Sequence, residues 1–170
     1  MQELIKLTAR SRTAYALACL EGLVAKFNYN SPMYKKLLDV LWSFTETENY
    51  GSWNSNVLSD RWGDYYNYGM WLGTDQTQGN KISKTDPFAD APEAIVGMMG
   101  LCALIGESHL YGAFQSDASE AYLEKVLAMM VQHSVPLPAF ERFKENSLEV
   151  GGKGGEMGFP APRDFYMRKV

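Results

Sequence analysis

The chain has few of the residues that build catalytic and metal sites. It holds only two histidines and two cysteines. His109 stands two positions after Glu107, so the two side chains point to different sides of a helix, and no Glu-x-x-His pair is present. No Gly-x-Ser-x-Gly motif occurs. The sequence therefore has nothing to anchor a nucleophile, a general base or a metal ion, and we expect a protein that is not an enzyme and has no cofactor.

The two cysteines also lack the setting of a zinc or disulfide site. Cys19 and Cys102 lie in apolar stretches without a neighbouring histidine or cysteine, which predicts buried, reduced and unpaired thiols. The first nine residues have no continuous apolar run of the kind found in a signal peptide. The longest apolar run, residues 94–106, is too short to span a bilayer. These features predict a cytoplasmic protein without a membrane segment.

The chain also has fewer basic than acidic residues. The net charge is −4, which argues against direct binding of nucleic acid, because that role needs lysines and arginines that neutralise phosphates. The run Gly151-Gly-Lys-Gly-Gly lacks the Gly-Lys-Ser/Thr of a phosphate loop and indicates a flexible connector. Residues 93–133 carry five acids and one cation, Lys125. We expect this acidic part of the chain to attract a basic partner.

The pattern that is present is helical. Apolar residues recur at helical spacing, and Ser31-Pro32 supplies a helix cap followed by a proline in the first turn. Asp90 with Glu93, and Asp117 with Glu120, have the spacing of capping boxes. These signals predict an all-α, single-domain bundle over residues 1–146, with an irregular aromatic-rich insert. Its four main helices should cover the stretches 4–26, 33–47, 92–111 and 118–133.

The residues beyond this bundle form a Gly-rich tail, 147–170. It ends with three aromatic side chains, Phe159, Phe165 and Tyr166. That apolar surface is enough to dock the tail on the bundle or on a partner. A short helix that carries Phe140 and Phe143 is also expected after Pro138.

Two groups of residues are candidates for contact with a partner. Residues 50–74 hold seven aromatic side chains, which either contact a partner or fold over the bundle as a buried lid. Glu107 and Glu124 are acids that a position near a helix N-terminus does not explain. The predicted partner-binding residues are Trp53, Trp62, Tyr65, Tyr66, Trp71, Glu107 and Glu124.

Three segments carry a resemblance to a group of known proteins. They are Ala14-Tyr-Ala-Leu-Ala-Cys-Leu-Glu21, Leu37-Leu-Asp-Val-Leu-Trp42 and the Ala-rich stretch Ala94–Tyr111. Together the layout resembles the all-helical immunity proteins that bacteria encode beside polymorphic toxins, over about half of the chain. The resemblance implies a cognate toxin as partner and inhibition by occlusion, without catalysis. It identifies no individual functional residue.

The predicted function is thus a protein-binding module, and an acidic face suits a nuclease toxin with a basic active site. The main alternative is a small-molecule or carbohydrate-binding helical domain, or an enzyme, that uses residues 50–74 as a pocket wall. A structural subunit that forms homo-oligomers through its tail is a further alternative. A convex acidic face would favour the protein-binding module. A concave aromatic pocket with converging polar groups would favour the small-molecule or carbohydrate-binding domain.

Overall fold

The computed structural model describes residues 7–59, 87–111, 117–148 and 157–168. In these residues the chain is helical and contains no strand, which confirms the all-α prediction. The described helices are α1 (Ala9–Phe27), α2 (Pro32–Trp42) with the short 3₁₀ helix η2 (Ser43–Thr45), α3 (Tyr50–Val57), α5 (Glu93–Tyr111), α6 (Asp117–Gln132), α7 (Glu141–Leu148) and α8 (Arg163–Met167). Helices α1, α2, α5 and α6 lie in the four stretches predicted as helical, but the prediction of four main helices is not confirmed. Helix α7 corresponds to the short helix expected after Pro138, although it begins after Phe140. Helix α3 lies in the insert that was predicted to be irregular, and α8 was not predicted.

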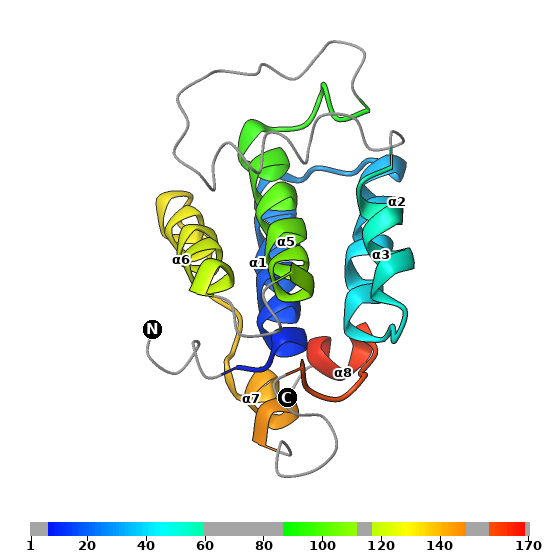
Figure 1. Cartoon of the computed structure of the whole chain (residues 1–170). Coiled ribbons are helices and arrows are strands. Elements are labelled where there is room, and N and C mark those ends of the chain that lie inside the picture. Colours follow the sequence, from blue (N-terminus) through cyan, green and yellow to red (C-terminus); the bar gives the residue numbers. More distant parts are fainter. Residues whose placement is uncertain (1–6, 60–86, 112–116, 149–156, 169–170) are drawn as a thin grey trace.

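Helix α1 is the centre of the fold. Every residue from Ala9 to Leu20 is buried. Figure 1 shows α5 and α1 side by side, with α2 and α3 on one flank, α6 on the other, and α7 and α8 at the end where α1 begins. The helix packs most extensively against α5, which in turn packs against α6. The core therefore runs along α1 and α5, and the outer face of α6 is left for contact with solvent.

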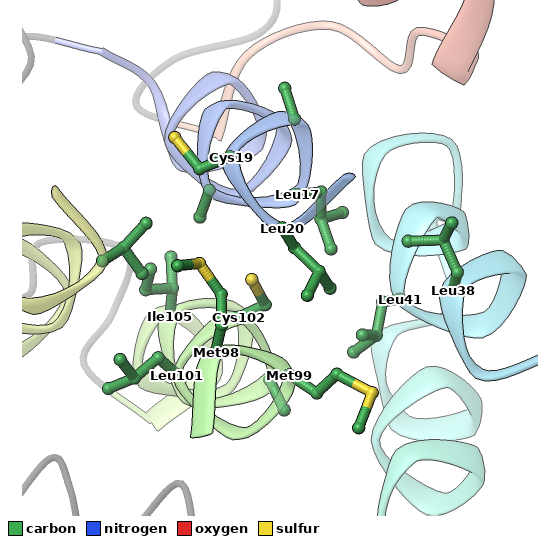
Figure 2. Packing of buried hydrophobic residues seen from close by; sticks show 14 of the residues in the cluster. Leu17, Cys19, Leu20, Leu38, Leu41, Met98, Met99, Leu101, Cys102 and Ile105 are labelled. Carbon is green, nitrogen blue, oxygen red and sulfur yellow. The ribbon is translucent and has the colours of Figure 1, made fainter. Parts of the chain in front are cut away.

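The core between these helices consists of aliphatic, methionine and cysteine side chains. Figure 2 shows Leu17 and Leu20 of α1 facing Met98 and Cys102 of α5, with Leu41 of α2 closing the layer. All five side chains are at most 1% exposed. Helix α5 is buried nearly all round because its sequence is apolar from Ile95 to Ile105. This confirms its predicted place as a central element.

The ends of the first two helices follow local signals. Thr8 caps α1 by accepting a hydrogen bond from the Ser11 amide, so the predicted start near residue 4 was wrong. Asn28 ends α1 in the left-handed region, at φ 52°. The Ser31 hydroxyl accepts from the amides of Met33 and Tyr34, which confirms the predicted cap of α2.

The predicted capping box of Asp90 with Glu93 was wrong. The start of α6, predicted at residue 118, was one residue off. Helix α5 begins at Glu93, and the Asp90 carboxylate, further out, accepts a hydrogen bond of 3.3 Å from the Tyr29 hydroxyl. Helix α6 begins at Asp117 itself, and the Glu120 carboxylate lies 3.7 Å from a guanidinium nitrogen of Arg12. Both acids are used for contacts between elements, because a tertiary partner competes with the local backbone for a carboxylate.

The C-terminal residues 157–168 dock on the bundle. The Ala161 amide donates to the Thr45 carbonyl (2.9 Å), and the Thr45 hydroxyl donates to the Ala161 carbonyl (2.8 Å). Arg163 forms a bidentate pair with Glu21 of α1 and lies over the Trp42 ring. The tail was predicted to dock on the bundle or on a partner. Residues 157–168 of it lie against the bundle, at the end where α1 begins.

Candidate functional site

The outer face of α6 is the candidate site. Its inner side is built from Ser119, Leu123, Val126 and Met130, which are buried against α1 and α5. The opposite stripe steps by four and three residues, so its members share one face of the helix. These exposed residues are Asp117, Ala121, Glu124, Ala128 and Val131. We call this stripe the α6 surface.

The α6 surface combines charge with an apolar strip. Asp117 and Glu124 are exposed, and neither carboxylate forms an ion pair or hydrogen bond with any part of the chain that the structure describes. Ala121 and Ala128 lie in the same stripe, and Val131 is 73% exposed, more than any other large hydrophobic residue described. Val131 lies one helical turn beyond Ala128, so these two apolar side chains are neighbours on this face. The stripe therefore has the composition of a contact surface.

A groove adjoins the C-terminal end of this surface. It has a volume of about 380 Å³ and lies where the end of α1, the start of α5 and the end of α6 meet. Phe27, 39% exposed, meets the ring of His133 edge to face at 5.4 Å along one wall. Glu93 and Gln132 supply polar atoms to the lining. The apolar strip thus ends in a hollow that can receive a side chain.

Acids dominate the helices that carry this surface. Between residues 87 and 133 the described part of the chain has one cation, Lys125, against a larger set of carboxylates. Glu120 is the one of them that approaches a buried arginine, Arg12. Burial lowers the pKa of Arg12, and the charge of Glu120 partly offsets this. The acids of this region are Asp90, Glu93, Glu107, Asp117, Glu120 and Glu124.

The structure divides the predicted partner-binding residues into three groups. Glu124 is exposed on α6, as expected for a contact residue, and Glu107 is half-buried near the end of α5. Trp62, Tyr65, Tyr66 and Trp71 lie outside the described residues. Trp53 belongs to the core.

Trp53 was the one described aromatic residue among the predicted contacts, and its ring is only 2% exposed. It meets Phe44 edge to face at 4.9 Å and donates from Nε1 to the Val40 carbonyl at 2.9 Å. Helix α3 presses it against Gly106 of α5. This ring fills the core, as in the lid alternative, and we remove it from the predicted contact residues.

Sequence reasoning missed the buried arginines of α1. Arg10 is 3% exposed, donates to the Thr47 carbonyl at 2.8 Å and to the Tyr50 hydroxyl, and lies over the Tyr50 ring. Arg12 is 6% exposed and donates to the Ser119 hydroxyl of α6. Both join elements that are far apart in sequence. Two arginines within the first turn of a helix that continues as an apolar stretch were the available signal, but the partners that satisfy them could not be seen from spacing.

The thiols and acids of the described residues do not form a reactive centre. Cys19 and Cys102 are free and buried, which confirms that they are unpaired. Burial raises the pKa of Cys19 to about 12 and that of Cys102 well above its usual value, so neither is a thiolate at neutral pH. Among the described residues no group of three histidines, cysteines or carboxylates could hold a metal ion.

Comparisons with protein-family models, with curated proteins and with solved structures return no match to this chain. Among the described residues, one stretch, Glu93–Leu110 of α5, has the length and composition of a membrane-crossing helix, and 72% of it is buried inside the fold. The core helix of a bundle has the same properties.

Proposed function

We propose that this chain is a non-catalytic protein-binding module, an immunity-type protein that neutralises a bacterial toxin in the cytoplasm by covering its active surface. The observation that carries the proposal is the α6 surface, where exposed acids that have no partner among the described residues alternate with exposed apolar side chains. Asp117 and Glu124 supply the charge, and Ala121, Ala128 and Val131 supply the apolar contact. This is the composition of a site for a basic protein with an apolar anchor.

The two parts of the surface have separate roles in the proposed complex. The acids steer a basic partner to α6, which raises the rate of association and makes that rate sensitive to salt. The apolar strip, with Phe27 at its end, excludes water after contact and slows dissociation. A nuclease toxin fits this division, because its active site is basic in order to bind phosphates. The acids of α6 take the place of those phosphates.

The test uses the protein encoded immediately upstream of this chain as the partner. We expect Asp117→Lys with Glu124→Lys to lower the association rate constant at low salt by about tenfold or more, since steering contributes factors of this size. The difference should shrink in high salt, where exposed charges are screened within about 3 Å at 1 M. Stopped-flow binding at two salt concentrations measures both effects.

A matched control comes from the opposite flank of the bundle. Glu46 and Glu48 are also exposed acids, and they lie between η2 and α3, across α1 from α6. The Glu46→Lys, Glu48→Lys variant changes the net charge by the same amount. It should leave the association rate within about twofold of the wild-type value, since only distant charges are altered. Equal loss in both variants, or no binding of the upstream protein, contradicts the proposal.

Val131→Asp separates the apolar contact from charge steering. It adds one acid at the most exposed apolar position of the surface. In the proposed complex this variant keeps its fast association but dissociates about tenfold faster, because an unpaired carboxylate enters the contact. The same variant should lose protection of cells that express the toxin.

A further inference from the structure

The arginines that the structure describes fall into two groups. Arg10, Arg12 and Arg163 hold the fold together through carbonyls, hydroxyls and carboxylates of distant elements. Arg142 of α7 and Arg168, directly after α8, form no ion pair and no hydrogen bond within the described chain. These two arginines come from different elements, yet both line the same groove. Their convergence is therefore not explained by the needs of the fold.

The groove they line is otherwise apolar. It has a volume of about 480 Å³ and lies between α1, α7 and α8. Its walls are formed by Pro138, Phe143, Tyr166 and Met167, of which Met167 is 39% exposed. The Nε atom of Arg142 is shut off from solvent and has no hydrogen-bond partner among the described residues. Pockets of about this volume receive small organic ligands.

The charged side chains that line the groove, among the described residues, are the two arginines. None of the described residues that line it is a carboxylate. The acids of α7 are Glu141 and Glu145, and the second of these lines a different hollow, next to Asn146 and Phe159. A guanidinium binds a carboxylate through two parallel hydrogen bonds, and the apolar walls favour a ligand body without further charge. We propose that this groove binds a small monocarboxylate with an apolar body, held between Arg142 and Arg168.

The site is independent of the function proposed above. It shares no residue with the α6 surface, and it lies at the end of the bundle that carries α7 and α8. A failed toxin-binding experiment leaves it untouched, and a failed ligand experiment leaves the α6 surface untouched.

Calorimetric titration with 4-phenylbutanoate and with its neutral amide tests the proposal. We expect the acid to bind at least about tenfold more tightly than the amide, because hydrogen bonds between charged groups are the stronger ones. Arg142→Gln and Arg168→Gln should each weaken binding of the acid about five- to tenfold and leave the amide unchanged. Equal binding of acid and amide, or no binding of the acid in the millimolar range, overturns the proposal.

Lys144→Gln is the matched control. Lys144 is an exposed cation on the same helix and does not line the groove. Its removal lowers the net charge by the same amount but should leave the affinity within about twofold, as a distant exposed charge does. If it weakens binding as much as Arg142→Gln does, the effect is one of overall charge and the site is refuted. Methyl signals of Ala139 and Met167 should shift with the acid, whereas that of Leu58, directly after α3, should not.

The arginine variants should fold normally, so a loss of binding can be distinguished from a loss of folding. Within the described residues, neither side chain has a hydrogen bond or an ion pair to lose. The urea midpoints of both variants should therefore match the wild-type value, as is usual for surface changes of this kind.

Discussion

The contact between Gly106 and Trp53 shows how closely single residues are matched in this fold. A Cβ atom at Gly106 would lie 2.6 Å from Cη2 of Trp53, which is closer than two carbon atoms can approach. Phe44 packs edge to face against the indole, with ring centroids 4.9 Å apart, and Nε1 of Trp53 donates a hydrogen bond to the Val40 carbonyl. The ring therefore cannot move away easily. A glycine costs helix propensity at this point of α5, and the close packing of α3 offsets that cost.

Gly106→Ala should destabilise the protein by about 1–3 kcal/mol, because overpacking of the core outweighs the gain in helix propensity. Gly51→Ala is the matched control. Gly51 is exposed in α3, and its nearest neighbour would be 3.8 Å from the new Cβ, so this change should stabilise the protein by about 0.5–1 kcal/mol. Urea denaturation of both variants measures the two values. A stabilising Gly106→Ala would show that α3 does not press on α5 as described.

At the scale of elements, the C-terminal segment is attached by polar contacts as much as by apolar burial. Asn146 of α7 is 4% exposed, and its amide imitates a backbone pair: Nδ2 donates to the Phe159 carbonyl at 3.0 Å and Oδ1 accepts from the Phe159 amide at 3.2 Å. Gly158 next to it has φ +81°, and a Cβ there would lie 2.5 Å from both Thr8 and Asn146. This backbone geometry brings α8 over the start of α1.

Asn146→Ala should cost about 2–3 kcal/mol, since it leaves two backbone groups of Phe159 without partners in a half-buried place. The loss should be local. Hydrogen exchange of the amides in residues 158–166 should speed up more than exchange in α5, which the segment does not stabilise directly. Glu145→Ala, at the exposed neighbouring position, should change neither quantity by much. Uniform acceleration across the fold would contradict a separate attachment of the segment.

For the whole molecule, burial of neutral thiols and phenols makes stability depend on pH on the alkaline side. Burial raises the pKa of Cys19 to about 12 from 9.0, and it raises the pKa values of Cys102, Tyr15, Tyr34 and Tyr166 as well. In the unfolded chain these groups lose their protons at lower pH than in the fold. The unfolded state then binds fewer protons, so the free energy of unfolding falls as the pH rises. The contribution is fully present below the unfolded pKa values.

The two thiols should cause the first part of this decrease in the free energy of unfolding as the pH rises. Above pH 9.0 each buried thiol should lower the free energy of unfolding by at most about 1.4 kcal/mol per pH unit. The Cys19→Ala, Cys102→Ala variant should therefore show a flatter decline than the wild type between pH 9 and pH 10. Urea denaturation across this range measures it, with each protein compared to its own value at neutral pH. Parallel curves would mean that the thiols titrate in the fold as they do in the unfolded chain.

The sequence alone determined the features that depend on neighbouring residues and on composition. The Ser31 cap, the end of α1 at Asn28 and the all-round apolar α5 follow from interactions within a few residues. The unpaired state of Cys19 and Cys102 followed from their apolar surroundings. The exposure of Glu124 was also predictable, because helical periodicity separates an inner from an outer face.

Only the tertiary structure decided which distant groups meet. It buried Arg10 against Tyr50, moved Trp53 into the core under Gly106, and brought Arg142 and Arg168 to one groove with α1. Arg10 and Tyr50 are 40 residues apart, and Arg10 and Gly158 are 148 apart. Spacing along the chain does not encode such meetings. They are set by the packing of whole helices, in which a charged side chain stays buried when distant carbonyls and hydroxyls satisfy it.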